Sequence, residues 1–451
     1  MTIRDIFEQG GKEEETGKPA MPRKHAQNRV YLEIKSRIHR KLLDRINLSI
    51  MESMSPDRLK EELKTIVERL CAEEPVAIND AEKALLVRDI QHEVLGLGPL
   101  ELLLADTTID DILVNTYKYV YVERKGKLEL TDVHFENDAH LLKIIDKIVS
   151  GIGRRVDESS PMVDARLPTG SRVNAIIPPL AIDGPILSIR RFAVDPYRMG
   201  DYIRFKTVVP EMAQVLEGLV KSKINLLVSG GTGTGKTTLL NILSSYIDGN
   251  ERIITIEDAA ELQLQQLHVV RLEMRPPNIE GRGEIPMFLL VRNSLRMRPD
   301  RIIVGEVRGV EVLDMLQAMN TGHEGSMTTV HANSPRDALI RLENMIGMAA
   351  ANMTAKTMRH QISSAITVVI HLSRLRDGKR KVTSIQEITG MEGDVVTMQE
   401  IFAFKQTGIA EDGTVLGHFQ ASGVRPKFVE RLKVNGIILD EDLFNPNRIY
   451  T

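Results

Sequence analysis

A chain of 451 residues is long enough for roughly three domains, and its 42% hydrophobic and 27% charged residues are ordinary for a soluble globular protein. The net charge of −3 predicts no general attraction to nucleic acid, and no apolar run approaches the roughly 18 residues that a membrane-spanning helix needs. A single cysteine, Cys71, excludes both a disulfide framework and a tetracysteine zinc module. Because the first residues lack the apolar core of a secretory signal, we expect the protein in the cytoplasm, with any membrane association through a partner or a surface.

The first part of the chain combines a polar tail with a helical region. Residues 1–27 are polar and carry glycines and prolines, so we expect a disordered tail. Over residues 28–95 apolar side chains recur at helical spacing in three stretches, the second of which begins with Ser55 as N-cap and Pro56 at the first helical position. The first stretch is also basic, as in helices that lie on anionic lipid, but such a helix is more often one member of a bundle. We therefore predict a three-helix bundle.

A change of pattern marks the next domain. The glycines and proline of residues 96–99 interrupt the helical spacing, and strand-like runs then alternate with turns and one helical stretch up to residue 192. This order predicts an α/β, sensor-like (PAS-like) domain over 96–192. Pro196 and Gly200 indicate a linker over 193–206.

Residues 207–451 alternate strand-like and helical stretches, which suits an α/β P-loop ATPase core. The segment 230–237 fits the pattern G-x-x-x-x-G-K-[ST] and lies between an apolar run suited to a buried parallel strand and the start of a helix. A β-rich extension is expected near 366–405, where Asp377-Gly378 marks a hairpin turn.

The chemistry of the loop follows from its backbone. Glycines let successive N–H groups turn toward phosphate oxygens at a helix N-terminus, whose dipole favours anions. Lys236 is expected to reach the β and γ phosphates of ATP, and the Thr237 hydroxyl to ligate Mg²⁺. A glycine-rich turn that binds nothing is the alternative, and the complete strand, loop and helix pattern leaves it little weight. The predicted nucleotide-binding residues here are Gly230, Gly231, Thr232, Gly233, Thr234, Gly235, Lys236, Thr237 and Thr238.

Two strand-like runs end in acidic residues. One ends in Glu306, about seventy residues after the loop lysine, where a P-loop sheet delivers a carboxylate to the attacking water and to a metal shared with Thr237. The other leads into Glu257, Asp258 and Glu261. Because phosphoryl transfer depends mainly on positioning and electrostatics, these acids are candidates for orienting water and completing the metal shell. A solvated acidic loop is the alternative for any one of them.

Two histidines, His323 and His331, lie eight positions apart in a segment of small residues. No cysteine cluster or H-E-x-x-H helix accompanies them, so zinc binding is poorly supported. A hydrogen bond to the γ phosphate or to its water is the more economical interpretation.

Arginines gather near predicted turns and strand ends of the preceding domain. Arginine presents a fixed fork of donors to phosphate oxygens and stabilises transition-state charge, whereas ordinary surface solvation accounts for some of these residues. They are Arg154, Arg155, Arg166, Arg172, Arg190 and Arg191, and a second group that could serve a neighbouring subunit is Arg292, Arg296 and Arg298.

Taken in order, four segments resemble the type II/type IV secretion ATPase superfamily. They are the P-loop at 230–237, the acidic box at 255–261, the segment 303–308 and the histidine box at 321–333, and the resemblance covers about residues 96–400. The arginine segments 154–161, 164–174 and 188–192, together with the helical bundle, look like the tight-adherence (Flp/Tad) pilus motor branch of the CpaF/TadA type. The general secretion and type IVa extension motors carry a tetracysteine zinc module, which a chain with one cysteine cannot form.

The resemblance implies a homohexameric ring that binds ATP between the N-terminal α/β domain and the RecA-like domain. It implies that Glu261 and Glu306 act on water and metal, without deciding which is the general base, and that the histidines contact phosphate. The implied catalytic residues are Glu257, Asp258, Glu261, Glu306, Arg308, His323 and His331. The residues implied to approach the nucleotide from the other domain are Arg166, Arg172, Arg190 and Arg191.

The expected function is that of a cytoplasmic ATP-hydrolysing motor, docked peripherally to an inner-membrane platform, that moves pilin subunits into or out of a fibre. A substrate-trafficking ATPase of a type IV conjugation or effector system would share every catalytic residue. A nucleotide-switched scaffold with little turnover is a rival from another class. A helicase is disfavoured by the acidic overall charge and the lack of an aromatic-basic stripe, so no nucleic-acid partner is expected.

Overall fold

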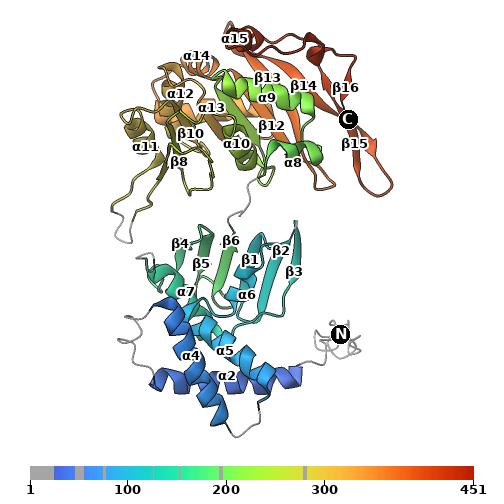
Figure 1. Cartoon of the computed structure of the whole chain (residues 1–451). Coiled ribbons are helices and arrows are strands. Elements are labelled where there is room, and N and C mark those ends of the chain that lie inside the picture. Colours follow the sequence, from blue (N-terminus) through green and yellow to red (C-terminus); the bar gives the residue numbers. More distant parts are fainter. Residues whose placement is uncertain are drawn as a thin grey trace, which may run out of the picture. The chain divides into compact units, whose positions relative to one another are not determined.

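The computed structural model describes residues 25–45, 55–74, 78–124, 126–151, 154–191, 197–277 and 282–450 (Figure 1). The chain forms two compact units, Met1–Arg191 and Phe192–Thr451, and each has its own hydrophobic core. Residues 1–24 of the predicted tail lie outside the described residues. In the described part of the chain, no helix is both long and apolar enough to cross a membrane.

The first unit begins with helices that pack around a common core. Between residues 25 and 95 the described chain forms α2 (His25–Arg45), α4 (Pro56–Ala72) and α5 (Asp80–Leu95) (Figure 1). Ile38, Leu63 and Ile90, one from each helix, are at most 1% exposed and belong to the same cluster. α5 begins with a capping box, in which the Asn79 side chain accepts from the backbone N–H of Glu82 and the Glu82 carboxylate accepts from that of Asn79.

Beyond α6 (Leu100–Ala105), the described residues of the first unit form a six-stranded antiparallel sheet in the order β3-β2-β1-β6-β5-β4. The strands are β1 (Asp111–Thr116), β2 (Tyr119–Arg124), β3 (Lys127–Leu130), β4 (Met162–Arg166), β5 (Arg172–Ile176) and β6 (Ile186–Arg190). α7 (Asp138–Ser150) buries Leu141, Ile145 and Ile148 in the core that also contains the inward-facing strand residues. The unit is therefore an α/β layer joined to a helical bundle.

One buried carboxylate, Glu93 of α5, joins these two parts. Its oxygens lie 2.7 Å from Lys35 Nζ of α2 and 2.8 Å from His140 Nε2 of α7. Lys147 Nζ of α7 adds hydrogen bonds to the carbonyls of Val94 (2.9 Å) and Gly96 (2.6 Å) at the end of the same helix. Because the hydrogen bonds and charges of His140 and Lys35 outweigh the effect of burial, the pKa of Glu93 is lowered to about 2.

The second unit is built on a ten-stranded sheet in the order β16-β15-β14-β13-β12-β7-β11-β10-β8-β9. Strands β12, β7, β11, β10, β8 and β9 are mutually parallel, and β13 to β16 continue the sheet in antiparallel fashion. The bounds are β7 (Leu226–Gly230), β8 (Ile253–Glu257), β9 (Val269–Glu273), β10 (Arg301–Val304), β11 (Met327–His331), β12 (Val368–Arg374), β13 (Arg380–Glu392), β14 (Val395–Ile409), β15 (Val415–Ala421) and β16 (Ile449–Tyr450).

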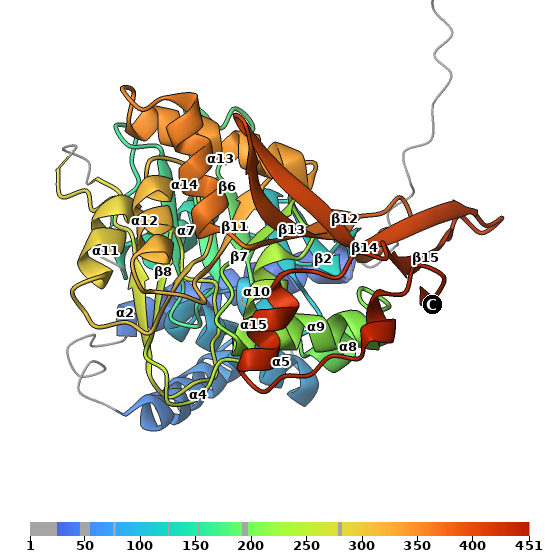
Figure 2. The same ribbon diagram turned by 90° about the horizontal axis from the view of Figure 1, so that it is seen from above.

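Helices cover both faces of this sheet (Figure 2). α8 (Met199–Arg204), α9 (Pro210–Lys221), α10 (Lys236–Ser244) and α15 (Phe428–Val434) contribute to one core. The other core contains α11 (Met287–Ser294), α12 (Glu311–Asn320), α13 (Pro335–Ala349) and α14 (Ala355–Ala365), and a 3-10 turn, η1 (Glu441–Phe444), lies near the C-terminus. The parallel strands β7, β8 and β10 are fully buried, as expected for the middle of an α/β sheet with two covered faces.

Of two expectations about this unit, the hairpin turn is present and the linker contains a helix. The Asp377-Gly378 hairpin is confirmed, since β12 and β13 pair in antiparallel fashion around it and Gly378 has φ of 81°. The linker over 193–206 is not a simple connector, because its described part contains α8, whose Met199 and Tyr202 are buried in the core. Two features of the sequence indicate this helix. Met199 and Tyr202 have the i, i+3 spacing of a helix, and Asp201 accepts from the backbone N–H of Arg198 at the helix start. Pro196 and Gly200 favour the interpretation as a linker instead.

We expect Glu93→Gln to lower the unfolding free energy of the first unit by about 2 kcal/mol at pH 7, because the buried Lys35 and His140 contacts lose their charged partner. The folded pKa of Glu93 lies below the ordinary 4.5, so this contribution is present above pH 4.5 and is lost as the pH falls toward 2. Thermal melting of both proteins at pH 7 and pH 4 measures this contribution. The difference in melting temperature between Glu93→Gln and wild type should be smaller at pH 4 than at pH 7.

The matched control is Glu68→Gln, which alters an exposed carboxylate on α4. If both variants have the melting temperature of the wild type at pH 7, the contacts of Glu93 between the bundle and the sheet do not contribute to stability.

Candidate active site

The phosphate-binding loop follows β7, a fully buried strand between β12 and β11. Gly235 adopts φ of 95° as the N-cap of α10, a left-handed conformation that favours glycine. A Cβ at Gly230, where φ is 155°, would lie 2.5 Å from the carbonyl oxygen of Leu372, so only glycine allows β12 to approach here. The nine residues of α10 thus begin directly from a tight loop, with their free N–H groups available to an anion.

Lys236, the first residue of α10, is buried against this loop. Its Nζ donates to the carbonyl oxygen of Gly231 at 2.9 Å and lies 3.4 Å from both ring nitrogens of His331. Burial lowers the pKa of Lys236, and the nearby Glu306 carboxylate opposes that shift. Burial and the charge of Lys236 also lower the pKa of His331, so its imidazole is neutral at pH 7.

Carboxylates reach the loop from neighbouring parallel strands. Glu306 follows β10, and one of its oxygens, Oε1, lies 3.0 Å from His331 Nε2 at the end of β11. The other oxygen accepts from Arg308 Nη2 at 2.7 Å, and Arg308 Nη1 donates to Asp258 Oδ2 at 2.9 Å. These contacts make a continuous polar chain that runs Lys236, His331, Glu306, Arg308, Asp258. We call it the catalytic chain below.

Glu257 has a different role from the one predicted for it as an acid that acts on water. It ends β8, is only 2% exposed, and one oxygen accepts the backbone N–H groups of Glu261 (2.6 Å) and Leu262 (2.8 Å). Burial raises the pKa of Glu257 to about 7. Glu257 therefore holds the backbone of the acidic loop, and through it the position of Glu261, whose charge also acts on Arg308.

A magnesium ion fits the residues present at the loop. Mg²⁺ is usually held by one or two carboxylates or hydroxyls together with substrate phosphates and waters. Thr237 follows Lys236 in the first turn of α10, and Glu306 Oε1 is a buried oxygen without a hydrogen bond in the described part of the chain, since the His331 contact lacks hydrogen-bond alignment. Glu306 Oε1 thus keeps acceptor capacity toward a metal or a water.

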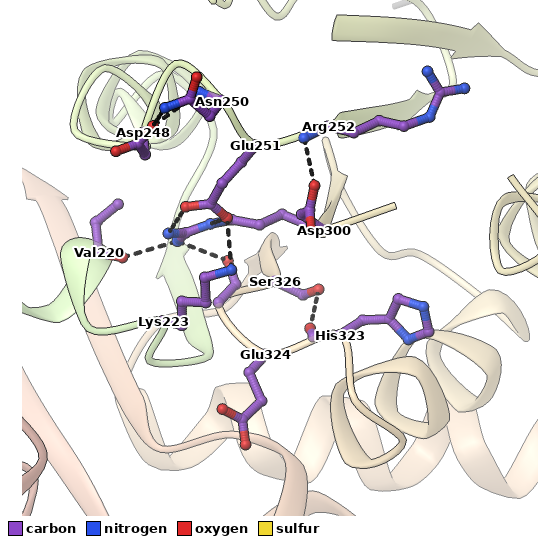
Figure 3. A network of polar contacts seen from close by, with 12 residues as sticks. Val220, Lys223, Asp248, Asn250, Glu251, Arg252, Asp300, His323, Glu324 and Ser326 are labelled. Atoms are coloured by element: carbon purple, nitrogen blue, oxygen red, sulfur yellow. Dashed lines mark hydrogen bonds and ion pairs between the residues drawn. The ribbon is translucent and has the colours of Figure 1, made fainter. Parts of the chain in front are cut away.

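His323 does not lie at the phosphate-binding loop of this unit. β11 runs parallel to β7 with His331 opposite Gly230, so residues that precede β11 lie at the opposite edge of the sheet. There the His323 carbonyl accepts from Ser326 Oγ at 2.7 Å, and Glu251, whose carboxylate pairs with the buried Arg301, belongs to the same network of polar contacts (Figure 3). The expectation that His323 contacts phosphate finds no support at the loop of its own unit, because the strand β11 separates His323 from His331, and it stays a prediction.

The predicted arginines of the first unit line up across its sheet. Arg166 of β4 pairs with Arg172 of β5, and Arg172 pairs with Arg190 of β6. Arg191 is tied to its own unit by a hydrogen bond to the carbonyl of Asp106. This row places three arginines at one end of three adjacent strands, although like charges directly opposite one another in a sheet are destabilising. Asp111 of β1 lies opposite Arg190 and places a carboxylate at the end of the row.

Some residues at the loop were not predicted. Tyr202 of α8 donates from its hydroxyl to the carbonyl of Gly235 at 3.3 Å, and Arg380 of β13 donates from Nε to that of Gly233 at 2.9 Å. Arg380 lies 147 residues from Gly233 in the chain, and no local pattern indicates the contact. The antiparallel pairing of β13 with β12, together with the parallel pairing of β12 with β7, brings Arg380 there.

With this geometry in place, comparison with known proteins decides the family. Residues 93–414 match the family described as type II/IV secretion system protein. The chain belongs to this family. Its members include ATPases, and with a complete phosphate-binding loop beside the catalytic chain the protein is a P-loop ATPase of the secretion type.

The similarity between this secretion ATPase and its relatives extends over most of the length of each relative. A Mycobacterium tuberculosis (strain CDC 1551 / Oshkosh) protein, provisionally named as a conjugal transfer protein, is 36% identical over 346 residues, which are 75% of this chain and 97% of that protein. The conjugal transfer protein TrbB of Rhizobium radiobacter is 31% identical, covering 68% of this chain and 91% of its own. The solved VirB11 ATPase of the Brucella suis type IV secretion system is 27% identical, covers 64% and 94%, and has a TM-score of 0.35.

We expect Glu257→Gln to stabilise the protein at pH 8 by roughly 1–3 kcal/mol, because the amide oxygen can still accept the loop N–H groups without a buried charge. The folded pKa of about 7 lies above the ordinary 4.5, so the advantage of the native carboxyl is complete below pH 4.5 and is lost as the pH rises toward 7. We therefore expect the difference in melting temperature between variant and wild type to be smaller at pH 5 than at pH 8.

As a control, Glu273→Gln changes an exposed carboxylate that accepts from the backbone N–H of Ala260 in the same loop. A pH-independent difference for Glu257→Gln would mean that its carboxyl does not titrate in the folded protein.

Proposed function

We propose that this secretion ATPase is a cytoplasmic, homohexameric motor that assembles, and can withdraw, a tight-adherence pilus through an inner-membrane platform. The observation that carries its ATPase core is the catalytic chain, which joins Lys236 of the phosphate-binding loop to Glu306 and Asp258 through His331 and Arg308. The pilus assignment is supported by the arginine segments of the first unit and by the bundle of α2, α4 and α5. Pilin is an indirect partner, reached through the platform.

In the proposed reaction the chain's own residues divide the work. Lys236 and the N–H groups of α10 hold the phosphates, and Mg²⁺, held by Thr237 and Glu306, would neutralise phosphate charge. Glu306 orients the attacking water and accepts its proton, because its Oε1 keeps acceptor capacity beside the neutral His331. Arg308 fixes Glu306 by holding its other oxygen.

Glu261 supports the same step from the acidic loop, whose backbone is held by Glu257. We assign Arg166, Arg172, Arg190 and Arg191 to the nucleotide as donors from the α/β domain, within the ring or across subunits. The alignment of Arg166, Arg172 and Arg190 in one row of the sheet supports a shared anionic target.

A second candidate is a substrate-trafficking ATPase of a conjugation or type IV secretion system. The names of the Mycobacterium tuberculosis and Rhizobium radiobacter relatives favour it. Both candidates use the same catalytic residues, so only the cargo separates them. A nucleotide-switched scaffold remains the third, and it predicts turnover at background even with the platform partner present.

Lys236→Ala is expected to reduce steady-state ATP turnover of the purified protein roughly 100-fold or more, because it removes the cation that meets the β and γ phosphates. Phosphate release under saturating ATP measures this. Lys221→Ala, which changes an exposed lysine at the end of α9, is the matched control and should keep wild-type turnover. Intact turnover in Lys236→Ala would remove the enzymatic core of the proposal.

Deletion of the gene in its own host separates the two cargoes. The pilus motor predicts loss of surface fibres with unchanged DNA transfer, and the wild-type gene but not the Lys236→Ala gene should restore the fibres. Electron microscopy of the cells and a mating assay measure both traits. Loss of DNA transfer with normal fibres would favour the trafficking ATPase instead.

A further inference from the structure

A buried histidine, His371 of β12, lies beside the phosphate-binding loop without belonging to the catalytic chain. It is 5% exposed and pairs with Ser229 of β7, the residue directly before Gly230. Its Nδ1 lies 2.8 Å from Ser229 Oγ. The ring also hydrogen-bonds the backbone of Asn333, two positions after His331. One imidazole therefore contacts both the strand that leads into the loop and the segment that follows β11.

The hydrogen-bond roles of this ring follow from its surroundings. Burial lowers the pKa of His371, and the backbone of Asn333 and the charge of Asp337 oppose that shift. The imidazole is therefore neutral at pH 7, with one nitrogen that donates and one that accepts. Because a hydrogen bond that raises the pKa of a histidine is one that the ring donates, the partner in Asn333 is its carbonyl oxygen. With Nδ1 facing Ser229 Oγ, both partners are satisfied when Nε2 donates to Asn333 and Nδ1 accepts from the Ser229 hydroxyl.

The pairing of β12 with β13 is irregular at this histidine. His371 lies opposite Ser384 and Leu372 lies opposite Val382, so Thr383 is an extra residue on β13. Such bulges bend a strand, re-aim the side chains beside it and are common next to active sites. Thr383 Oγ1 donates to the carbonyl of His371 at 3.4 Å. The backbone of His371 is thus held from β13, while its side chain contacts β7.

The segment after β11 matters because of the histidine that ends this strand. The His331 ring lies 3.4 Å from Lys236 Nζ and 3.0 Å from Glu306 Oε1. The ladder between β11 and β7 ends at His331, and the contact of His371 with Asn333 continues the connection beyond that point. A shift of this segment would move the His331 ring relative to both charged groups.

We propose that His371 is a positioning residue for ATP hydrolysis, because its ring bridges Ser229 and Asn333. By this bridge it sets the segment of His331 against the phosphate-binding loop, and it acts through His331 without being a catalytic residue itself. This role rests on the proposed ATP hydrolysis at Lys236. Loss of the bridge should slow the catalytic step more than it weakens ATP binding, since the N–H groups that hold the phosphates are fixed by α10.

Steady-state kinetics of His371→Leu and His371→Gln in the full-length protein test this role. Leucine leaves Ser229 and Asn333 without their partner, so we expect kcat to fall roughly tenfold and KM for ATP to change less than about threefold. Glutamine can donate and accept, so His371→Gln is expected to recover most of the wild-type kcat. Each rate is divided by the folded fraction of the protein, measured by circular dichroism, so that lost stability is not counted as lost kcat.

A double variant separates positioning from a general effect on the fold. If His371 acts through His331, then His371→Leu lowers kcat no further in a His331→Ala protein, whereas independent effects would multiply. Ser384→Ala is the matched control, because it removes the hydrogen bond from the residue opposite His371 to Glu400, at 3.0 Å, on the side away from the loop. This control should keep the wild-type kcat.

Wild-type kcat in folded His371→Leu, an equal loss in His371→Gln, or multiplied losses in the double variant overturns the positioning role. If His371→Leu does not fold, Ser229→Ala removes one end of the bridge by a smaller change, and wild-type kcat in that variant overturns the role as well. Lys236→Ala distinguishes the two levels. Retained turnover in Lys236→Ala contradicts the ATP hydrolysis itself, whereas its loss there beside wild-type kcat in the His371 variants contradicts only the positioning role.

Discussion

The parallel register of four neighbouring strands is the constraint on which the site depends. His331 lies opposite Gly230 across β11 and β7, and Val304 lies opposite both Thr328 and Ile256. Parallel strands place their carboxyl ends at one edge of the sheet, so segments far apart in sequence meet there without any local contact in the chain. A slip of one residue in β10 or β11 would turn the following side chains to the other face and break the catalytic chain.

At that edge of the sheet, each charged side chain lies next to a group of opposite charge or next to a neutral one. His331 lies between the Lys236 ammonium and the Glu306 carboxylate, and burial lowers the pKa of its imidazole, so it separates the two charged groups without adding a charge. Arg308 bridges Glu306 and Asp258, and Glu306 raises the pKa of Arg308 further. Glu257 stays out of this balance because its pKa near 7 and its backbone contacts make it a support for the acidic loop.

Local patterns in the sequence predicted what depends on local geometry. The loop with Lys236, the strand that ends in Glu306 and the Asp377-Gly378 hairpin each combine a short motif with flanking hydrophobic periodicity. The motif containing His323 and His331 carries no information about where a strand begins, so the sequence does not reveal that β11 separates the two histidines. Contacts such as Arg380 with Gly233 join segments 147 residues apart, and sequence spacing contains no signal for them.

The two halves of the large sheet border the phosphate-binding loop from different sides. The parallel strands β7, β8, β10 and β11 carry the loop and the residues of the catalytic chain, whereas α8 and the antiparallel extension line a cavity of about 660 Å³ beside the loop. Tyr202 and Arg380 both bond to carbonyls of the loop itself, so the loop backbone is held from the side of the cavity as well as from its own strand. Because β12 pairs with β7 and β13 pairs with β12, the extension is continuous with the strand that carries the loop. The wall of the cavity and the phosphate-binding backbone are therefore joined by hydrogen bonds within one sheet, and α8, the first described helix of the second unit, is attached at the same point.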